Sequence, residues 1–392
     1  MWMADSDEAN SQDWPDTPPP TLALTLGDRL REAVTRLAAS PRLQAWAGRF
    51  PLTRPLARQQ MRGLFDLCAG FVYSQVLYAF VTAGLLEALR AGPRRPEELT
   101  RHSGLPEPAL RRLLQAAAAL GLAAPRSRGR FGLGLRGAAL AGNPGAVAMI
   151  RHHRLLYGDL ADPLALLRGE APPTQIGRYW TYVEGTGADA PAPDAVQAYS
   201  DLMAVSQAMI AEAVTRGFPF RRYRRILDVG GGTGTFLEHV AQTAPGAALT
   251  LFDLPPVATA AADRMAHKRL GDRLRCIGGD FTADSLPSGH DLITLVRVVY
   301  DHDDATVLTL LKACRAALDK GGSLLIAEPM SGRPAGERIA DAYFSFYLLA
   351  MGPGEIRSPD AHGALLRQAG FGRITALPGP MPDLARLILA RP

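Results

Sequence analysis

The feature that most constrains the fold is an apolar strand that runs directly into a cluster of glycines. The segment ILDV at 226–229 is followed by Gly230, Gly232 and Gly234, and a helical pattern begins at Thr235. Glycine allows positive φ and lets a backbone approach a ligand without a Cβ in the way. This strand, turn and helix predict an α/β domain with a ligand at the turn.

The spacing of the glycines narrows the choice of ligand. A dinucleotide fingerprint needs a further glycine where Thr235 stands, and the Gly-Lys-Ser/Thr of a P-loop is missing. Asp253 ends the next apolar run, where a carboxylate can hold a ribose hydroxyl pair. Asp228 suits a cationic ligand better than a pyrophosphate. We therefore predict S-adenosylmethionine, which carries a sulfonium, an ammonium and a ribose; a tight turn without a ligand is the alternative.

Length, charge and cysteine content limit the classes of protein to which the chain can belong. A chain of 392 residues predicts two domains, or one with a helical extension. A net charge of +5 is too small to indicate a nucleic-acid-binding protein. Cys68, Cys276 and Cys314 lie far apart, so we expect no metal site and a reducing, cytoplasmic environment. Residues 1–20 hold five acids, four prolines and no base, which predicts a disordered acidic tail.

Two N-terminal segments raise the question of a membrane. Residues 21–55 form a basic amphipathic segment, which predicts either a helix packed on the protein or its partner subunit, or a contact with a membrane surface. The segment from Leu67 to Leu86 has no charge and is long enough to span a bilayer. Its polar and glycine residues favour a buried helix instead.

Residues 56–215 are predicted as a helical and winged-helix domain. A helix starts at Pro96, a longer one covers 106–120, and 124–135 indicate a β wing. Such a motif can bind DNA through Arg111 and Arg112, which makes a transcriptional regulator with a cofactor-sensing domain an alternative. We favour a dimerisation module without nucleic acid.

The pattern changes to alternating strands and helices for the predicted domain at 216–392. Strands are predicted at 225–229, 248–252, 273–277, 291–299, 322–327, 372–377 and 385–390, and helices at 235–243, 256–267, 304–318 and 358–369. This order is typical of a doubly wound α/β domain, with an antiparallel element at its end.

Spaced motifs add a family resemblance. They are LDVGGGTG at 227–234, FDLP at 252–255, GGDF at 278–281, DHDD at 301–304 and GGSLLIAEP at 321–329. Together they resemble the plant caffeate-type small-molecule O-methyltransferases. The resemblance implies a Rossmann-like class I methyltransferase domain with a seven-stranded sheet, an N-terminal all-α/winged-helix dimerisation domain, and a homodimer.

A narrower resemblance concerns the substrate. RGLFDLCAGFVYSQVLYAF at 62–80 and LYGDLADPLALLRGE at 156–170 resemble the hydroxycarotenoid O-methyltransferases of photosynthetic bacteria. This implies methylation of the tertiary 1-hydroxyl of an acyclic carotenoid, a large apolar alcohol. A phenolic or polyketide acceptor is the alternative within the same chemistry.

The resemblance also assigns the cofactor residues. It places Gly230 and Gly232 at the methionine moiety and Asp253 at the ribose. Asp280 and Phe281 are expected at the adenine. Arg297 lies close to a basic cofactor residue of the family, although the plant members carry theirs one position earlier.

The catalytic position departs from the family. Where the plant enzymes have a histidine base, this chain has Tyr300; the glutamate that orients the base is present as Glu328. Ionising a tyrosine of pKa about 10 at pH 7 costs roughly 4 kcal/mol, so Tyr300 is expected to position the substrate. His302 has a suitable pKa and is the second candidate base. A weak base fits an aliphatic alcohol better than a phenol; loss of methyl transfer is a further alternative.

Overall fold

The structure is a computed structural model that describes residues 25–178, 207–268, 270, 273–332, 338–381 and 384–392. The chain divides into two compact units, Met1–Gln75 and Val76–Pro392. The predicted acidic tail at 1–20 lies outside the described residues. The predicted domain boundaries at 20, 55 and 215 stay predictions.

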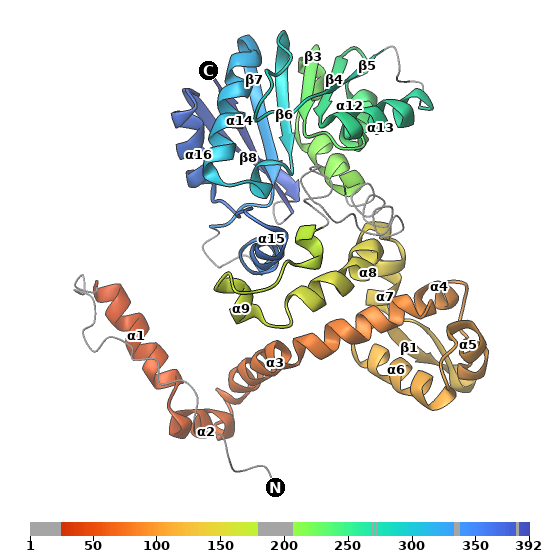
Figure 1. The fold of residues 1–392 in the computed structure, drawn as a ribbon. Coiled ribbons are helices and arrows are strands. Elements are labelled where there is room, and N and C mark those ends of the chain that lie inside the picture. The colour runs from red at the N-terminus through yellow and green to blue at the C-terminus, as the bar shows by residue number, and fades with distance from the viewer. Residues whose placement is uncertain (1–24, 179–206, 269, 271–272, 333–337, 382–383) are drawn as a thin grey trace. The chain divides into compact units, whose positions relative to one another are not determined.

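The first unit consists of helices. It contains α1 (Leu26–Ala38), α2 (Pro41–Arg49) and the larger part of α3 (Arg54–Thr82) (Figure 1). Thr25 caps α1 by accepting a hydrogen bond from the backbone N–H of Asp28 at 3.2 Å, and Pro41 starts α2 at a position where its missing N–H costs nothing. Neither α1 nor α2 has a buried residue.

The prediction of one buried helix from Leu67 to Leu86 is only partly right. Helix α3 ends at Thr82, and Gly84, with φ of 71°, turns the chain into α4 (Leu85–Arg90). Phe80, Val81, Leu85 and Leu86 are buried, whereas the residues at 67–79 are exposed or half-buried. By length and composition, α3 is the one helix among the described residues that could cross a membrane.

The N-terminal part of the second unit has the predicted helix–helix–wing order. Helices α5 (Pro96–Ser103) and α6 (Glu107–Ala119) precede the antiparallel strands β1 (Ala123–Arg126) and β2 (Arg130–Leu133). Three further helices follow: α7 (Leu135–Ala141), α8 (Pro144–Asp159) and α9 (Pro163–Leu167). Of the two arginines considered for DNA contact, Arg111 is ion-paired with Glu97 and Glu107 at 2.8 and 2.7 Å.

A seven-stranded sheet forms the C-terminal part, with the order β5-β4-β3-β6-β7-β9-β8 (Figure 1). The strands are β3 (Arg225–Val229), β4 (Ala248–Asp253), β5 (Leu274–Gly278), β6 (His290–Val296), β7 (Leu318–Glu328), β8 (Arg373–Met381) and β9 (Ala385–Arg391). β3 to β7 pair in parallel, and β9 pairs antiparallel with both β7 and β8. The predicted late antiparallel element is therefore confirmed.

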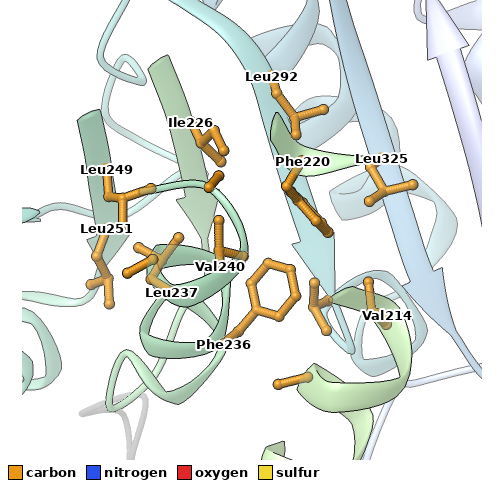
Figure 2. Packing of buried hydrophobic residues seen from close by; sticks show 14 of the residues in the cluster. Val214, Phe220, Ile226, Phe236, Leu237, Val240, Leu249, Leu251, Leu292 and Leu325 are labelled. Atoms are coloured by element: carbon orange, nitrogen blue, oxygen red, sulfur yellow. The ribbon is translucent and has the colours of Figure 1, made fainter. Parts of the chain in front are cut away.

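Helices cover both faces of this sheet. Along β3, Ile226 packs with α12 (Thr235–Thr243) and α13 (Pro255–Ala266), whereas Leu227 and Val229 pack with α14 (Asp304–Ala317) and α16 (Pro359–Gln368). This alternation follows from successive strand side chains pointing to opposite faces. Figure 2 shows the first of these cores, in which the rings of Phe220 and Phe236 meet edge to face at 5.8 Å.

The sheet order fixes where a ligand can bind. From β3 the chain moves outward to β4 and β5 and then returns to the other side of β3 as β6. In open α/β sheets, the crevice outside the carboxyl ends of the strands at such a switch point is the usual binding place. The predicted cofactor residues follow these strand ends.

Candidate active site

The glycine loop after β3 has the conformation that the sequence predicts. Gly230, Gly232 and Gly234 have φ of 69°, 55° and 78°, in the left-handed region. A Cβ at Gly230 would lie 2.7 Å from Val298 Cγ2, so that position admits only glycine. A Cβ at Gly232 would meet nothing within 4 Å, so the backbone there borders open space in which a ligand could approach.

Asp253 at the end of β4 is directed toward this loop. Its carboxylate accepts hydrogen bonds from the backbone N–H groups of Gly232 at 2.7 Å and Leu254 at 2.8 Å. Burial raises the pKa of Asp253, although the two N–H groups oppose the shift. A carboxylate so placed fits a ribose hydroxyl pair, since its oxygens have further lone pairs.

Asp228, the penultimate residue of β3, is 1% exposed. Its Oδ1 accepts a 2.6 Å hydrogen bond from Thr294 Oγ1 on β6. Burial raises the pKa of Asp228 to about 7; the Thr294 hydrogen bond opposes this, and the charge of Asp253 adds to it. A ligand ammonium near this carboxyl would favour its charged form.

The expected adenine residues follow β5. Asp280 Oδ1 accepts hydrogen bonds from the backbone N–H of Thr282 at 2.8 Å and from its hydroxyl at 2.7 Å. The ring of Phe281 meets the ring of His302 edge to face at 5.3 Å. His302 therefore lies beside an expected adenine residue and two residues after Tyr300, and burial lowers its pKa, which keeps the imidazole neutral at pH 7.

Tyr300 lies in a short helical turn, Val299–Asp301, and is 4% exposed. Its phenol oxygen accepts a 3.1 Å hydrogen bond from Arg297 Nε, and its ring meets Phe344 at 6.3 Å. Burial raises the pKa of the phenol well above its usual range, although the charge of Arg297 opposes this. Tyr300 is thus protonated at neutral pH, which suits a group that positions the substrate and does not act as a base.

Arg297 has a backbone conformation that is rare for a side chain of its size. Its φ is 59°, while its N–H still donates to the carbonyl of Ala327 on β7 at 2.9 Å. Non-glycine residues in this region are concentrated at functional sites. The turn after β6 directs the guanidinium to the Tyr300 phenol.

Glu328 does not contact the phenol. Its Oε2 accepts a 3.2 Å hydrogen bond from the backbone N–H of Tyr300, and its Oε1 lies 3.2 Å from His362 Nε2 on α16. The second contact has the distance of an ion pair without the alignment of a hydrogen bond. Glu328 therefore fixes the backbone at Tyr300, and the hydroxyl is oriented by Arg297.

Arg357 is a further residue of the site, and it does not stand out in the sequence. It is 3% exposed and donates to the carbonyls of Val299 at 3.1 Å and His302 at 2.9 Å, and to the carboxylate of Asp304 at 2.7 Å. It thereby holds both ends of the turn that carries Tyr300. A single arginine in a loop gives no sequence signal of this role.

A row of aromatic rings leads away from Tyr300. Phe344 follows at 6.3 Å, Tyr343 at a further 5.1 Å and His153 at a further 5.6 Å. The row continues through Tyr157 at 6.0 Å to Tyr78 at 6.1 Å. Each ring is a neighbour of the next, although they come from α3, α8, the turn after β6 and a π-helix.

That π-helix (Arg338–Phe344) and α15 (Ser345–Met351) lie outside the predicted helices. Two adjacent histidines of α8 anchor them: His152 is 3.0 Å from the Tyr347 hydroxyl, and His153 is 2.8 Å from the Tyr343 hydroxyl. Burial, and then the charge of His153, lower the pKa of His152 to about 4, so this contact is made by a neutral imidazole. π-helical turns are rare and are frequent at functional sites.

The predicted site residues therefore fall into three groups. The first group is the glycine loop with Gly230 and Gly232, together with the two carboxylates beside it, Asp228 and Asp253. Asp280, Phe281 and His302 form a second part of the same edge. Tyr300, Arg297 and Glu328 form the acceptor group, with Phe344. Among the described residues, no cluster of three or more histidine, cysteine or acidic side chains could hold a metal ion.

The fold and the glycine loop define a methyltransferase of the Rossmann-like class. Comparison with known families makes this specific: residues 157–372 match the O-methyltransferase domain and residues 65–135 match the O-methyltransferase dimerisation domain. The chain belongs to this family and is an S-adenosylmethionine-dependent O-methyltransferase. The dimerisation domain supports a homodimer.

Two similar relatives carry the same name. Demethylspheroidene O-methyltransferase of Cereibacter sphaeroides is 44% identical over 355 residues, which cover 91% of this chain and 93% of the relative. The enzyme of that name from Rhodobacter capsulatus is 45% identical over 341 residues, covering 87% of this chain and 84% of the relative.

Solved structures support the fold. Human N-acetylserotonin methyltransferase in complex with S-adenosylmethionine superposes with a TM-score of 0.67 at 22% identity, over 85% of this chain and 97% of that one. The mitomycin 7-O-methyltransferase MmcR superposes with a TM-score of 0.72 at 23% identity, over 86% of this chain and 100% of that one.

Proposed function

We propose that this enzyme methylates the tertiary 1-hydroxyl of an acyclic carotenoid. The observation that carries the proposal is the name shared by the two relatives at 44% and 45% identity, both demethylspheroidene O-methyltransferases. The aromatic row from Tyr300 to Tyr78 supports it, because a line of rings offers a long apolar wall to a polyene.

The proposed cofactor contacts use the first two groups of the site. Gly230 and Gly232 approach the methionine part, and Asp228 faces its ammonium. Asp253 holds the ribose hydroxyls, and Asp280 and Phe281 hold the adenine. When bound, S-adenosylmethionine supplies a methyl group that the sulfonium has already activated for displacement.

The chain's own part in the reaction is mainly alignment. Positioning the acceptor oxygen in line can remove on the order of 7–11 kcal/mol from the barrier. We propose that the Tyr300 phenol, oriented by Arg297, hydrogen-bonds the acceptor hydroxyl, and that Glu328 and Arg357 hold the backbone of its turn. The acceptor hydroxyl would keep its proton until late in the transfer, when attack on the activated methyl group would have made its oxygen acidic. Neutral His302 is the candidate acceptor for that proton.

The protonated state of Tyr300 favours an aliphatic over a phenolic acceptor. A phenol gains most from a base that removes its proton before transfer, which a buried tyrosine of raised pKa cannot do. Phenolic acceptors are still the competing possibility, since a relative from Streptomyces cremeus, 30% identical over 81% of this chain, is a 3-amino-4-hydroxybenzoate 4-O-methyltransferase.

The test is direct. The purified protein is incubated with methyl-labelled S-adenosylmethionine and, separately, with 1-hydroxycarotenoids dispersed in detergent, flavonoids and aromatic polyketides. We expect labelled ether only from the carotenoids. Transfer only to phenols would replace the proposed acceptor, and transfer to none would favour a chain that has lost the reaction.

We also propose that the homodimer is a cytoplasmic protein that contacts the inner face of a membrane. The proposal is supported by the basic amphipathic N-terminal helices and by the low solubility in water of the proposed substrate. The alternative of a DNA-binding regulator has little support, since Arg111 is engaged by two glutamates of its own domain.

A further inference from the structure

Helices α1 and α2 present an apolar face that nothing in the described part of the chain covers. On α1, Leu26, Leu30, Val34 and Leu37 are 86%, 68%, 58% and 59% exposed. Their spacing of four, four and three residues puts them within about 80° of arc on one side of the helix, at about 100° per residue. A contiguous exposed apolar patch of this kind marks an interaction surface.

The second helix adds exposed aromatic rings. Trp46 and Phe50 stack at 5.0 Å with an interplanar angle of 12°, and they are 52% and 39% exposed. Leu43 is 36% exposed and lies one turn earlier. Tryptophan is enriched at the boundary between lipid and water, because its ring is apolar and its N–H is polar.

The charges are arranged around the apolar stripe of α1. Arg29 and Arg36 flank it on one side and Arg31 on the other, at about 100° per residue. The two acids, Asp28 and Glu32, fall on the opposite side. A helix with an apolar face bordered by arginine is the pattern that lies flat in the interface of an anionic bilayer.

Helix α3 adds a basic groove. Arg54, Arg58 and Arg62 recur at every fourth residue, so they lie along one side of the helix, and all three line a groove of about 740 Å³. The acid in the lining is Asp66, and no ion pair of the three arginines is found among the described residues. Like charges four residues apart destabilise a helix, so this row is best accommodated when anions neutralise it.

The position of these elements in the chain argues against a dimer interface as their main role. The dimerisation domain match begins at residue 65. Helices α1 and α2 and the arginine row of α3 all precede it. Between residues 25 and 66 there are eight arginines and three acids, a local charge of +5 in 42 residues.

From these observations we propose that α1, α2 and the arginine row of α3 form a docking arm for an anionic phospholipid surface. The apolar residues of α1 and α2 enter the headgroup region, and the arginines bind lipid phosphates. This deepens the proposed membrane contact by naming its residues and its lipid chemistry. It would let the enzyme take an apolar alcohol from the bilayer in which that alcohol dissolves.

Vesicle binding tests the docking arm. The full-length protein is sedimented with vesicles of phosphatidylcholine alone or mixed with phosphatidylglycerol. We expect strong binding only to the anionic vesicles, and weaker binding at high salt, which screens exposed charges. The triple variant Arg54→Gln, Arg58→Gln, Arg62→Gln should bind about 100-fold more weakly, at roughly fivefold for each basic side chain near an anionic surface.

A matched control removes the same charge elsewhere. The triple variant Arg90→Gln, Arg101→Gln, Arg112→Gln changes three exposed arginines of the second unit and should bind like the wild type. The double variant Leu30→Glu, Val34→Glu tests the apolar face and should also lose binding. Equal binding to both kinds of vesicle, or full binding by the Arg54 triple variant, would overturn the proposal.

The competing occupant of this surface is a second copy of the chain. Light scattering after size-exclusion chromatography distinguishes the two: we expect every variant to remain a dimer. A monomeric Leu30 and Val34 variant would instead assign the face to the dimer interface and remove the docking arm.

The test separates this proposal from the proposed function. The Arg54 triple variant should retain wild-type methyl transfer to carotenoid dispersed in detergent and lose most of it with carotenoid in anionic vesicles. A wild-type protein that binds anionic vesicles but methylates no carotenoid would contradict the proposed substrate and leave the docking arm in place. Normal carotenoid methylation without vesicle binding would contradict the docking arm and leave the proposed substrate in place.

Discussion

Asp253 ends one parallel strand of the sheet and Tyr300 follows another, yet they are held by different means. Asp253 accepts from two backbone N–H groups, one of them in the glycine loop. The Tyr300 phenol accepts from the side chain of Arg297 and packs on Phe344, which comes from a distant helix. The cofactor part of the site is thus built from backbone geometry, and the acceptor part from packed side chains. One part can stay constant while the other is adapted to a new acceptor.

The largest expected effect lies on the cofactor side. Asp253→Ala removes the proposed ribose contacts and two loop hydrogen bonds, and we expect S-adenosylmethionine to bind about 100-fold more weakly, since hydrogen bonds to charged groups are worth 1.5–3 kcal/mol each. Calorimetric titration measures the change. Asp263→Ala, at an exposed position of α13, is the control. Unchanged affinity in Asp253→Ala would remove that residue from the cofactor site.

The next effect lies on the acceptor side. Tyr300→Phe keeps the ring on Phe344 and removes the oxygen that Arg297 orients, so we expect turnover to fall about 30-fold through loss of alignment. The dissociation constant of S-adenosylmethionine should stay within about twofold, because the phenol is not in the glycine-loop group.

Tyr223→Phe is the matched control, since that ring stacks on Phe218 at 5.7 Å in another part of the domain. Wild-type turnover in Tyr300→Phe would exclude the phenol from the mechanism. A large loss of cofactor affinity in Tyr300→Phe would show that the acceptor part of the site also contributes to cofactor binding.

The smallest effect is a pH dependence that belongs to the cofactor side alone. The pKa of Asp228 is raised to about 7 by burial, so the carboxyl is neutral below that pH and charged above it. A cationic ligand is attracted only by the charged form, and its affinity should fall by roughly tenfold from pH 8 to pH 6. The folding stability of the ligand-free protein should depend on pH in the opposite direction, because charging the buried Asp228 costs free energy. The contribution of Asp228 to folding stability decreases as pH rises from about 4 to about 7.

Titrations of cofactor at several pH values measure this dependence, and Asp228→Asn should flatten it. Thr294→Val removes the hydrogen bond that opposes the shift, worth about 1 kcal/mol, and should move the profile upward by about half a pH unit or more. A flat wild-type profile would show that Asp228 does not face the ammonium.

The sequence predicts the cofactor side well and the acceptor side poorly, for physical reasons. Helix α12 was predicted with the observed bounds, and the end of β4 to within one residue, because strand, glycine turn and helix are encoded in adjacent residues. Tyr300 itself stood out, but its partners could not be predicted. Phe344 lies more than forty residues away, and Arg357 acts through carbonyl groups, which leave no pattern in a sequence.

Two sequence predictions failed, each for its own physical reason. The π-helix that carries Tyr343 and Phe344 was missed, since one extra residue in a helical turn disturbs the apolar period that predictions rely on. The segment at 67–86 was predicted as buried throughout, yet its first half is exposed or half-buried, because uncharged composition does not say whether a residue is covered by its own chain.

The left-handed backbone of Arg297 sets a limit on how this enzyme can be improved. A non-glycine residue there costs about 1–2 kcal/mol, which glycine would recover. Arg297→Gly would therefore relieve the backbone, while the Tyr300 hydroxyl would lose the donor that orients it. Thermostability and acceptor alignment compete at this one position, so a variant library screened for melting temperature alone would drift away from activity.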